Sequence, residues 1–188
     1  MSCPIANVTL LMHEDLMYVE RVKRGDTASF RFLVDKYQDL AYTIAYRILK
    51  NSGDAEDAAQ EGFVKAYQQM HRFEGKSKFS TWLYTIIYRS AIDKTHQRRF
   101  FKMKESDFEQ QAHTDTPVAR VLAEEQSALV KKAVDALPPT ESLLITLFYM
   151  NDCSVREIAD ISGLTEINVK VKLFRARKTL QERLRFLL

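Results

Sequence analysis

Four acidic residues close together are the side chains in this sequence most able to do chemistry. Asp54, Glu56, Asp57 and Glu61 have the density of oxygen ligands that a metal ion needs. However, no histidine stands at helical spacing beside them, and the helix dipole favours acidic residues in a first helical turn. We therefore expect no metal site and no bound cofactor.

The remaining reactive residues do not predict nucleophilic catalysis either. The four histidines are scattered, and neither Cys3 nor Cys153 has a neighbouring base that would activate it. The sequence also lacks a glycine-rich loop that would cradle phosphates. We expect a protein that is not an enzyme and has no small-molecule substrate. A nucleic-acid-processing enzyme is kept as a third hypothesis, which metal-dependent turnover by the isolated protein would support.

The basic residues indicate nucleic acid because they are concentrated in two segments. The net charge of the 188 residues is only +3. Nevertheless, lysine and arginine far outnumber acidic residues from Arg72 to Lys102, and again from Leu164 onwards. Two separate basic segments indicate two contacts with one polyanion, or with two.

The first basic segment also carries aromatic residues. Phe73, Phe79, Trp82, Tyr84 and Tyr88 are interleaved with Arg72, Lys76, Lys78, Arg89 and Lys94. Aromatic faces beside a cationic track suit unpaired bases, each of which gains about 1–3 kcal/mol by stacking. Because a duplex hides its base faces, this mixture favours strands that are separated or being separated. The alternative is that Phe79 and Trp82 belong to the core, although one indole can close a core and also face a groove.

The second basic segment follows the pattern of a helix-turn-helix. Ser154 and Glu157 form a capping box, Ser162-Gly163-Leu164 forms a tight turn, and Thr165 can cap a second helix. That helix has an apolar face of Val169, Leu173, Ala176 and Leu180, and it leaves Lys170, Lys172, Arg175, Arg177 and Lys178 outside. The arrangement predicts a second helix that enters a DNA groove. A plain amphipathic helix pair is the alternative.

An acidic helix between these elements has the opposite charge. Asp57, Gln60 and Glu61 form a polar stripe that suits the basic helix of a protein partner. A solvated helix face is the alternative interpretation.

The pattern of the whole chain predicts an all-α fold of two small helical domains joined by a flexible linker. Only 5 glycines and 4 prolines interrupt its long periodic segments. We expect a loosely ordered N-terminus at 1–12, a first domain at 13–101, a linker at 102–119 and a second domain, with the helix-turn-helix, at 120–188. The predicted helices lie at about 14–24, 30–49, 54–70, 80–99, 117–136 and 141–150, with Asp54 capping the third. No apolar run is long enough to span a membrane, and two cysteines suit a reducing cytosol, so we expect a cytoplasmic protein without membrane insertion.

Several blocks resemble the bacterial RNA polymerase sigma factors of the extracytoplasmic-function (ECF) type. They are DAEDAAQEGFVKAY from Asp54, RFEGKSKFSTWLY from Arg72, AID from Ala91, and the closing EIA…G…VK…LFRARKTL. The resemblance implies a dissociable, non-catalytic subunit of RNA polymerase. Its first domain would bind the clamp helices of the core enzyme and capture the melted minus-ten element. Its second would contact the flap and read the minus-thirty-five element, and the resemblance also implies an anti-sigma protein as a partner.

The resemblance also assigns roles to residues by position. The core-polymerase contacts would be Asp57, Gln60 and Glu61. The minus-ten and upstream DNA contacts would be Arg72, Phe73, Lys76, Lys78, Phe79, Trp82, Arg89, Lys94, Arg98 and Arg99. The minus-thirty-five contacts would be Asn168, Lys170, Val171, Phe174, Arg175 and Arg177.

Two departures from the family pattern concern DNA preference. Arg89 stands where the family usually has asparagine, and a long cation cannot copy the paired donor and acceptor of an amide. Val171 replaces a common serine; it can touch a thymine methyl group but cannot hydrogen-bond a base.

A stand-alone helix-turn-helix regulator, with an N-terminal bundle for sensing or dimerisation, is the second hypothesis. It predicts tight and specific duplex binding without polymerase.

Overall fold

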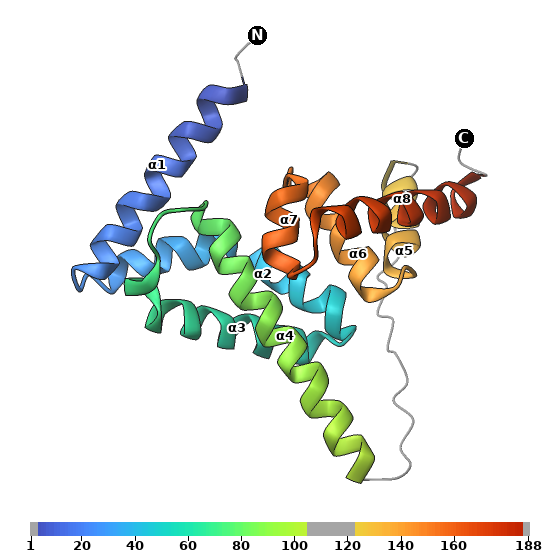
Figure 1. Ribbon diagram of the computed structural model, residues 1–188, viewed down its shortest axis with the longest axis horizontal. Coiled ribbons are helices and arrows are strands. Elements are labelled where there is room, and N and C mark those ends of the chain that lie inside the picture. The colour runs from blue at the N-terminus through green and yellow to red at the C-terminus, as the bar shows by residue number, and fades with distance from the viewer. Residues whose placement is uncertain (1–3, 105–122, 186–188) are drawn as a thin grey trace.

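The computed structural model describes residues 4–104 and 123–185, and every regular element in these ranges is helical (Figure 1). The N-terminal unit consists of α1 (Pro4–Lys23), α2 (Ala28–Leu49), α3 (Ser52–Gln68), the short 3-10 helix η1 (Met70–Arg72) and α4 (Phe79–Lys104). The C-terminal unit consists of α5 (Ala123–Asp135), α6 (Pro139–Ile145), the π-helical turn η2 (Thr146–Met150), α7 (Val155–Ser162) and α8 (Glu166–Arg183). The predicted all-α class is confirmed.

The N-terminal unit is built on the contacts among α2, α3 and α4. Helix α2 buries one continuous face, formed by Leu33, Tyr37, Ala41, Ile44 and Ile48. Helix α3 packs in the core with small residues, since Ala55, Ala58, Gly62 and Ala66 are all buried. Small side chains let helix backbones approach closely, so α4 can lie directly against α3 while contributing its own buried face of Leu83, Ile87 and Ala91.

Gly62 is the point of closest approach between α3 and α4. A Cβ atom there would stand 3.2 Å from the Cα of Ile87, which is tighter than ordinary packing allows. We expect Gly62→Ala to destabilise the protein by about 0.5–2 kcal/mol, because overpacking of about 1–3 kcal/mol exceeds the gain of up to about 1 kcal/mol in helix propensity. Urea unfolding measures the effect.

Gly53, in the first turn of the same helix, provides the matched control. A Cβ atom there would meet only the Asn51 side chain, at 3.6 Å. Gly53→Ala should therefore leave stability unchanged or raise it by up to about 1 kcal/mol. A Gly62→Ala protein as stable as Gly53→Ala would contradict the close approach of the two helices.

Helix α1 starts earlier than the sequence predicted. Residues 4–12, which belong to the segment expected at 1–12, lie in the helix, and residues 1–3 lie outside the described ranges. Pro4 is the first helical residue, a position where its fixed φ angle is favourable. The C-terminal half of α1 is held on α2 by Asp15, which accepts hydrogen bonds from the Tyr37 hydroxyl and from Lys36 Nζ, the latter at 2.5 Å.

Two other predicted boundaries change. Asn51, rather than Asp54, caps α3, because its side chain accepts a hydrogen bond from the Asp54 backbone amide at 3.0 Å. Helix α2 ends at Leu49, as predicted, and Lys50 caps it in the left-handed conformation with φ of 53°. Helix α4 continues to Lys104, so residues 102–104 of the predicted linker are helical, and residues 105–122 lie outside the described ranges.

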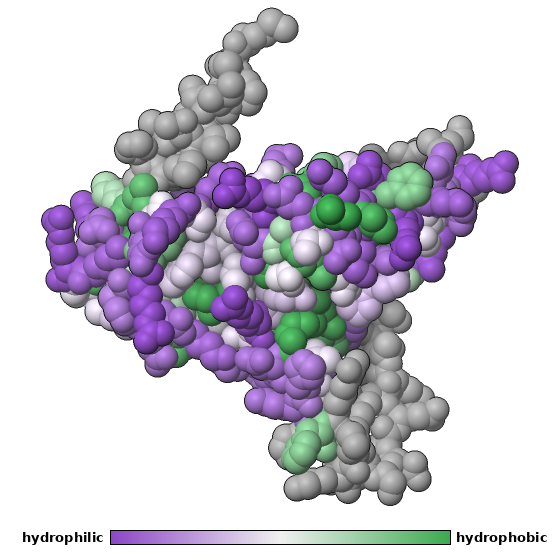
Figure 2. Space-filling model, viewed as in Figure 1, coloured by the Kyte–Doolittle hydropathy of each residue, from purple (hydrophilic) through white to green (hydrophobic). Residues whose placement is uncertain are grey.

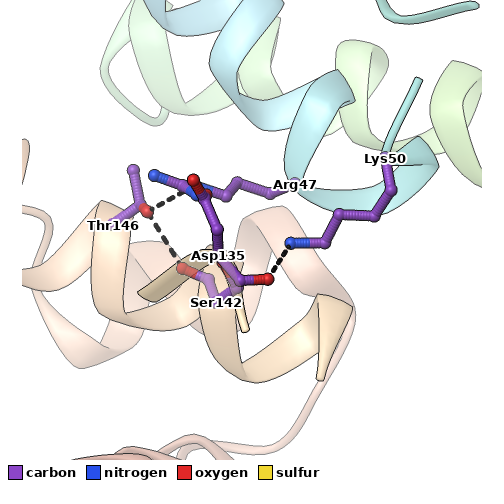
Figure 3. A network of polar contacts seen from close by, with 5 residues as sticks. All are labelled: Arg47, Lys50, Asp135, Ser142 and Thr146. Carbon is purple, nitrogen blue, oxygen red and sulfur yellow. Dashed lines mark hydrogen bonds and ion pairs between the residues drawn. The ribbon is translucent and has the colours of Figure 1, made fainter. Parts of the chain in front are cut away.

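The C-terminal unit packs on the N-terminal unit in two places. Helix α6 lies against α2, and α7 lies against the first half of α4 (Figure 1). Figure 3 shows the first contact, where Arg47 and Lys50 at the end of α2 reach the junction between α5 and α6. The Arg47 guanidinium binds the Asp135 carboxylate and donates to Thr146 Oγ1 at 3.1 Å. Lys50 Nζ donates to the Asp135 backbone oxygen at 2.9 Å.

Arg47 is a buried cation in this contact. The residue is only 5% exposed, and burial lowers the pKa of its guanidinium. A charge removed from water in this way depends on its partners for compensation. Asp135 and Thr146 supply that compensation from the C-terminal unit, so the contact between the two units is a specific one.

Candidate nucleic-acid interface

The loop between η1 and α4 is the part of the N-terminal unit where aromatic and basic residues meet. Gly75, at its tip, has a φ of +72°, which lets the chain reverse without strain. The base of the loop is held by Lys23, whose Nζ donates to the Phe73 backbone oxygen at 2.9 Å. The loop is thus attached to α1 as well as to α4.

The aromatic residues of this loop form one cluster with different exposures. The rings of Phe73 and Phe79 lie 5.6 Å apart, and each packs against Trp82, at 5.2 and 5.8 Å. Phe73 and Phe79 are buried, so in this arrangement they support the loop and do not offer a face for stacking. Trp82 is half-buried, so its indole closes the core and also reaches the surface.

A cleft of about 260 Å³ opens beside the exposed side of Trp82. Its walls come mainly from α4, with one residue from the loop, one from the end of α3 and one from α7. The lining residues are Gln69, Ser77, Thr81, Trp82, Thr85, Ile86, Arg89 and Asp160. Hydroxyl groups, an indole and a guanidinium around one cleft match the needs of an unpaired base, which offers a flat face and a polar edge.

The basic residues predicted to contact DNA fall into three groups. Arg72, Lys76 and Arg89 are exposed around the loop and the cleft. Lys94 and Arg98 lie on the side of α4 that faces α3, where they pair with acidic residues there: Lys94 Nζ donates to Asp57 at 2.9 Å. The side chain of Arg99 lies outside the described part of the chain.

Lys78 forms the third group because it is bound to the helix-turn-helix. Its Nζ lies 2.7 Å from Glu157 Oε1 of α7. Burial alone would raise the pKa of Glu157, but hydrogen bonds from Lys78 and Ser154 more than offset it and lower that pKa below its usual value. Nearby, Thr85 Oγ1 of α4 lies 3.5 Å from the Asp160 backbone oxygen of α7.

The polar stripe lies exposed on α3, as its spacing predicted. Asp57, Gln60 and Glu61 all face solvent. Two of them are paired within the chain: Asp57 with Lys94, and Glu61 with Lys65 at 2.7 Å. These exposed ion pairs contribute little to stability. A basic helix of a partner protein can therefore take the place of Lys94 and Lys65 with little loss of folding free energy.

The helix-turn-helix has the local structure that the sequence predicted. The capping box is present, since the Glu157 amide donates to Ser154 Oγ at 3.2 Å and the Ser154 amide donates back to the Glu157 carboxylate at 2.8 Å. Gly163 makes the turn with a φ of +71°. Thr165 caps α8 by accepting from the Asn168 amide at 3.2 Å.

Helix α8 buries one face and exposes the other. Val169, Leu173 and Ala176 are buried against α6 and α7. The six residues predicted to read DNA all face solvent: Asn168, Lys170, Val171, Phe174, Arg175 and Arg177. The N-terminal unit leaves this face uncovered, because α8 packs on α5, α6 and α7.

Sequence reasoning missed the residues that join the two units. Glu157 was already explained as a capping residue, and Arg47 stood in a helix whose apolar pattern indicated the core. Only Arg47 offered a signal, because it lies three residues after the buried Ile44 and directly before the buried Ile48, within the apolar face of the helix.

Two known protein families match this chain, one in each of its two units. The model of Sigma-70 region 2 matches residues 33–100, and the model of Sigma-70 region 4 matches residues 127–180. The ECF RNA polymerase sigma factor SigW of Bacillus subtilis is 32% identical over 177 residues, which cover 89% of this chain and 95% of SigW. The ECF sigma-E factor of Escherichia coli is 31% identical over 179 residues, covering 90% of this chain and 93% of its own. The chain belongs to the ECF sigma factors.

Two solved structures have the same fold as this one. RpoE, crystallised with the anti-sigma factor NepR from Bartonella quintana, has a TM-score of 0.71 at 23% identity, covering 83% of this chain and 96% of that one. CnrH, in complex with the cytosolic domain of CnrY, has a TM-score of 0.64 at 22% identity, covering 91% and 97%. Region 2 of this sigma factor therefore corresponds to α2–α4, and region 4 to α5–α8.

Within residues 4–104 and 123–185, no three histidine, cysteine, aspartate or glutamate side chains gather as a metal site would require. Over the same ranges, none of the helices combines the length and the apolar character needed to cross a membrane.

Proposed function

We propose that this sigma factor binds core RNA polymerase, directs it to promoters and opens the DNA there without catalysis of its own. The observation that carries the proposal is the cleft beside Trp82, where a half-buried indole and the exposed Arg89 stand next to a loop with cations. An unpaired base can stack on the indole while the cations hold its phosphates. The energy of such contacts offsets the cost of unpairing, so no nucleotide hydrolysis by this chain is needed.

The remaining surfaces take complementary roles in the proposal. Asp57, Gln60 and Glu61 on α3 receive the clamp helices of the core enzyme. Region 4 contacts the flap, and the outward face of α8 reads the minus-thirty-five duplex. Arg72 directly precedes the loop that holds the minus-ten strand, and Lys76 lies within that loop.

The chain can contact the minus-ten and minus-thirty-five elements at the same time only if its two units move apart. The two promoter elements lie about 25 base pairs apart, which is roughly 85 Å at about 3.4 Å per base pair. Helix α7 of region 4, in contrast, lies directly against α4 of region 2, and Glu157 neutralises Lys78. We infer that core polymerase binds an open form in which region 4 has left the minus-ten loop.

Run-off transcription with purified core polymerase tests the proposed function. A library of genomic promoters should yield transcripts only when the chain is added. Gel shifts with and without core enzyme separate this function from a stand-alone regulator, which would bind a specific duplex tightly by itself. Absence of any chain-dependent transcript, together with tight core-independent binding, would favour the regulator.

An anti-sigma protein is the partner we propose for the inactive state. RpoE and CnrH, which have the same fold, were each solved with a bound partner, and for RpoE that partner is an anti-sigma factor. Such a partner would compete with core polymerase for the chain. Addition of a candidate anti-sigma protein should therefore abolish the chain-dependent run-off transcript, and excess core enzyme should restore it.

A further inference from the structure

The outward face of α8 carries an apolar stripe. Ile167, Val171 and Phe174 are 73%, 42% and 66% exposed. At 100° per residue these three side chains fall within about 60° of one another around the helix. They point away from the buried Val169 and Leu173. Figure 2 shows green surface along the helix at the upper right, amid a mostly hydrophilic surface, where Figure 1 places α8.

Cationic and amide side chains flank this stripe on both sides. The same helical geometry places Lys170 and Arg177 along one edge, and Asn168 and Arg175 along the other. All four are exposed. An apolar centre between two basic edges is complementary to a major groove, where the base edges lie between two phosphate backbones.

The stripe limits what α8 can read. Valine, isoleucine and phenylalanine cannot hydrogen-bond the donors and acceptors of base edges. The one apolar group that a base pair presents in the major groove is the C5-methyl group of thymine. From Ile167 to Phe174 the helix rises about 10.5 Å, which corresponds to about three base-pair steps.

We propose that Ile167, Val171 and Phe174 recognise the methyl groups of neighbouring thymines in the minus-thirty-five element, while the flanking residues hold phosphates. This inference rests on the proposed function and adds the chemical basis of its upstream specificity. It predicts a minus-thirty-five element with two or three closely spaced thymines on the strands facing α8. The basic edges favour DNA over an apolar protein partner, because a duplex supplies phosphates on both sides of the groove.

Replacing thymine by uracil tests the proposal, because it removes only the methyl group. The holoenzyme first selects its promoters from a random duplex library, and the selected duplex is then made with uracil in the minus-thirty-five element. Each contacted methyl should contribute about four-fold to affinity, which corresponds to about 0.8 kcal/mol. Two contacted methyl groups should therefore give about a sixteen-fold loss, and uracil placed outside the two promoter elements should change affinity by less than about two-fold.

Substitutions in the apolar stripe show whether its side chains cause the loss of affinity for uracil duplexes. Val171→Ala should reduce the loss caused by uracil at one thymine, because the side chain that contacts the methyl is shortened. Val130→Ala on α5 is the matched control, since Val130 is 38% exposed on another helix and should leave the uracil effect unchanged.

Two results would overturn different parts of the argument. Specific promoter binding that is equal for thymine and uracil duplexes would overturn methyl recognition and assign the stripe to a protein partner. Failure of the holoenzyme to select any duplex would instead overturn the proposed function itself.

Discussion

Replacing Trp82 by alanine is expected to lower promoter opening by roughly ten-fold to one hundred-fold, while closed-complex binding changes by less than about three-fold. The indole is half-buried on Phe73 and Phe79 and lines the cleft beside Arg89. Loss of one stacked base costs about 1–3 kcal/mol, and every 1.4 kcal/mol is about ten-fold. The loss falls on opening, because base faces become available only when the strands separate. Permanganate reactivity of promoter thymines measures opening, and gel shifts at low temperature measure closed complexes.

Two further variants separate stacking from packing. Trp82→Phe keeps an aromatic face and should retain most of the opening. Tyr88→Ala removes another half-buried aromatic from the same helix, one that does not line the cleft. It should therefore reduce stability without a selective defect in opening. If the Trp82→Ala protein retained as many permanganate-reactive thymines as the unmodified protein, the stacking role of the indole would be wrong.

Replacing Asp135 by asparagine is expected to separate the two units of the free protein. Arg47 is 5% exposed and would lose its carboxylate partner, while Lys50 would keep the Asp135 backbone oxygen. A hydrogen bond to a charged group contributes about 1.5–3 kcal/mol, so the packed arrangement should weaken by roughly ten-fold to one hundred-fold. Arg47 can regain water by undocking of the C-terminal unit, which makes separation of the units easier than unfolding. Small-angle X-ray scattering should show a larger radius of gyration.

Cys153 provides a second measurement of the same opening. It is partly buried, and burial raises the pKa of its thiol to about 11, so it should react slowly in the packed form. Cys153 directly precedes the N-cap of α7, the helix that packs on α4, so its thiol lies beside the contact between the units. Burial raises the pKa of Tyr84 in α4, and the nearby Cys153 raises it further. In a Cys3→Ser background, Asp135→Asn should therefore accelerate alkylation of Cys153.

Asp35→Asn is the matched control for this experiment. It breaks an exposed pair on α2, where Arg31 Nε lies 3.6 Å from the carboxylate, and such pairs contribute about 0–1 kcal/mol. The control should leave both the scattering and the alkylation rate unchanged. If Asp135→Asn behaved like Asp35→Asn, the contact in Figure 3 would not hold the units together.

The predictions that succeeded from sequence concern features encoded by neighbouring residues. The capping box of Ser154 and Glu157, the left-handed Gly163 and the Thr165 cap each depend on residues three or four positions apart. The same local period distinguishes the buried Val169 and Leu173 from the exposed side of α8. Helix geometry fixes these relations before any tertiary contact forms, so the sequence alone contains them.

Predictions of helix ends were less successful, because neighbouring residues alone do not decide where a helix begins or ends. Asn51 and Asp54 are both good capping residues, and the sequence does not say which one starts α3. The choice depends on where α2 ends, and Lys50 ends it in a left-handed conformation that lysine rarely adopts. In the folded protein Lys50 reaches the Asp135 backbone oxygen, a contact from a distant segment.

The sequence by itself determined the helical class, the helix-turn-helix, the exposed polar stripe on α3 and, through its motifs, the resemblance to ECF sigma factors. Tertiary structure decided which members of the aromatic and basic segment remain accessible. It buries Phe73 and Phe79, leaves Trp82 at a cleft, and pairs Lys78 with Glu157. The physical reason is that periodicity gives each helix an inner face, whereas the partner of that face is selected by packing among segments far apart in the chain.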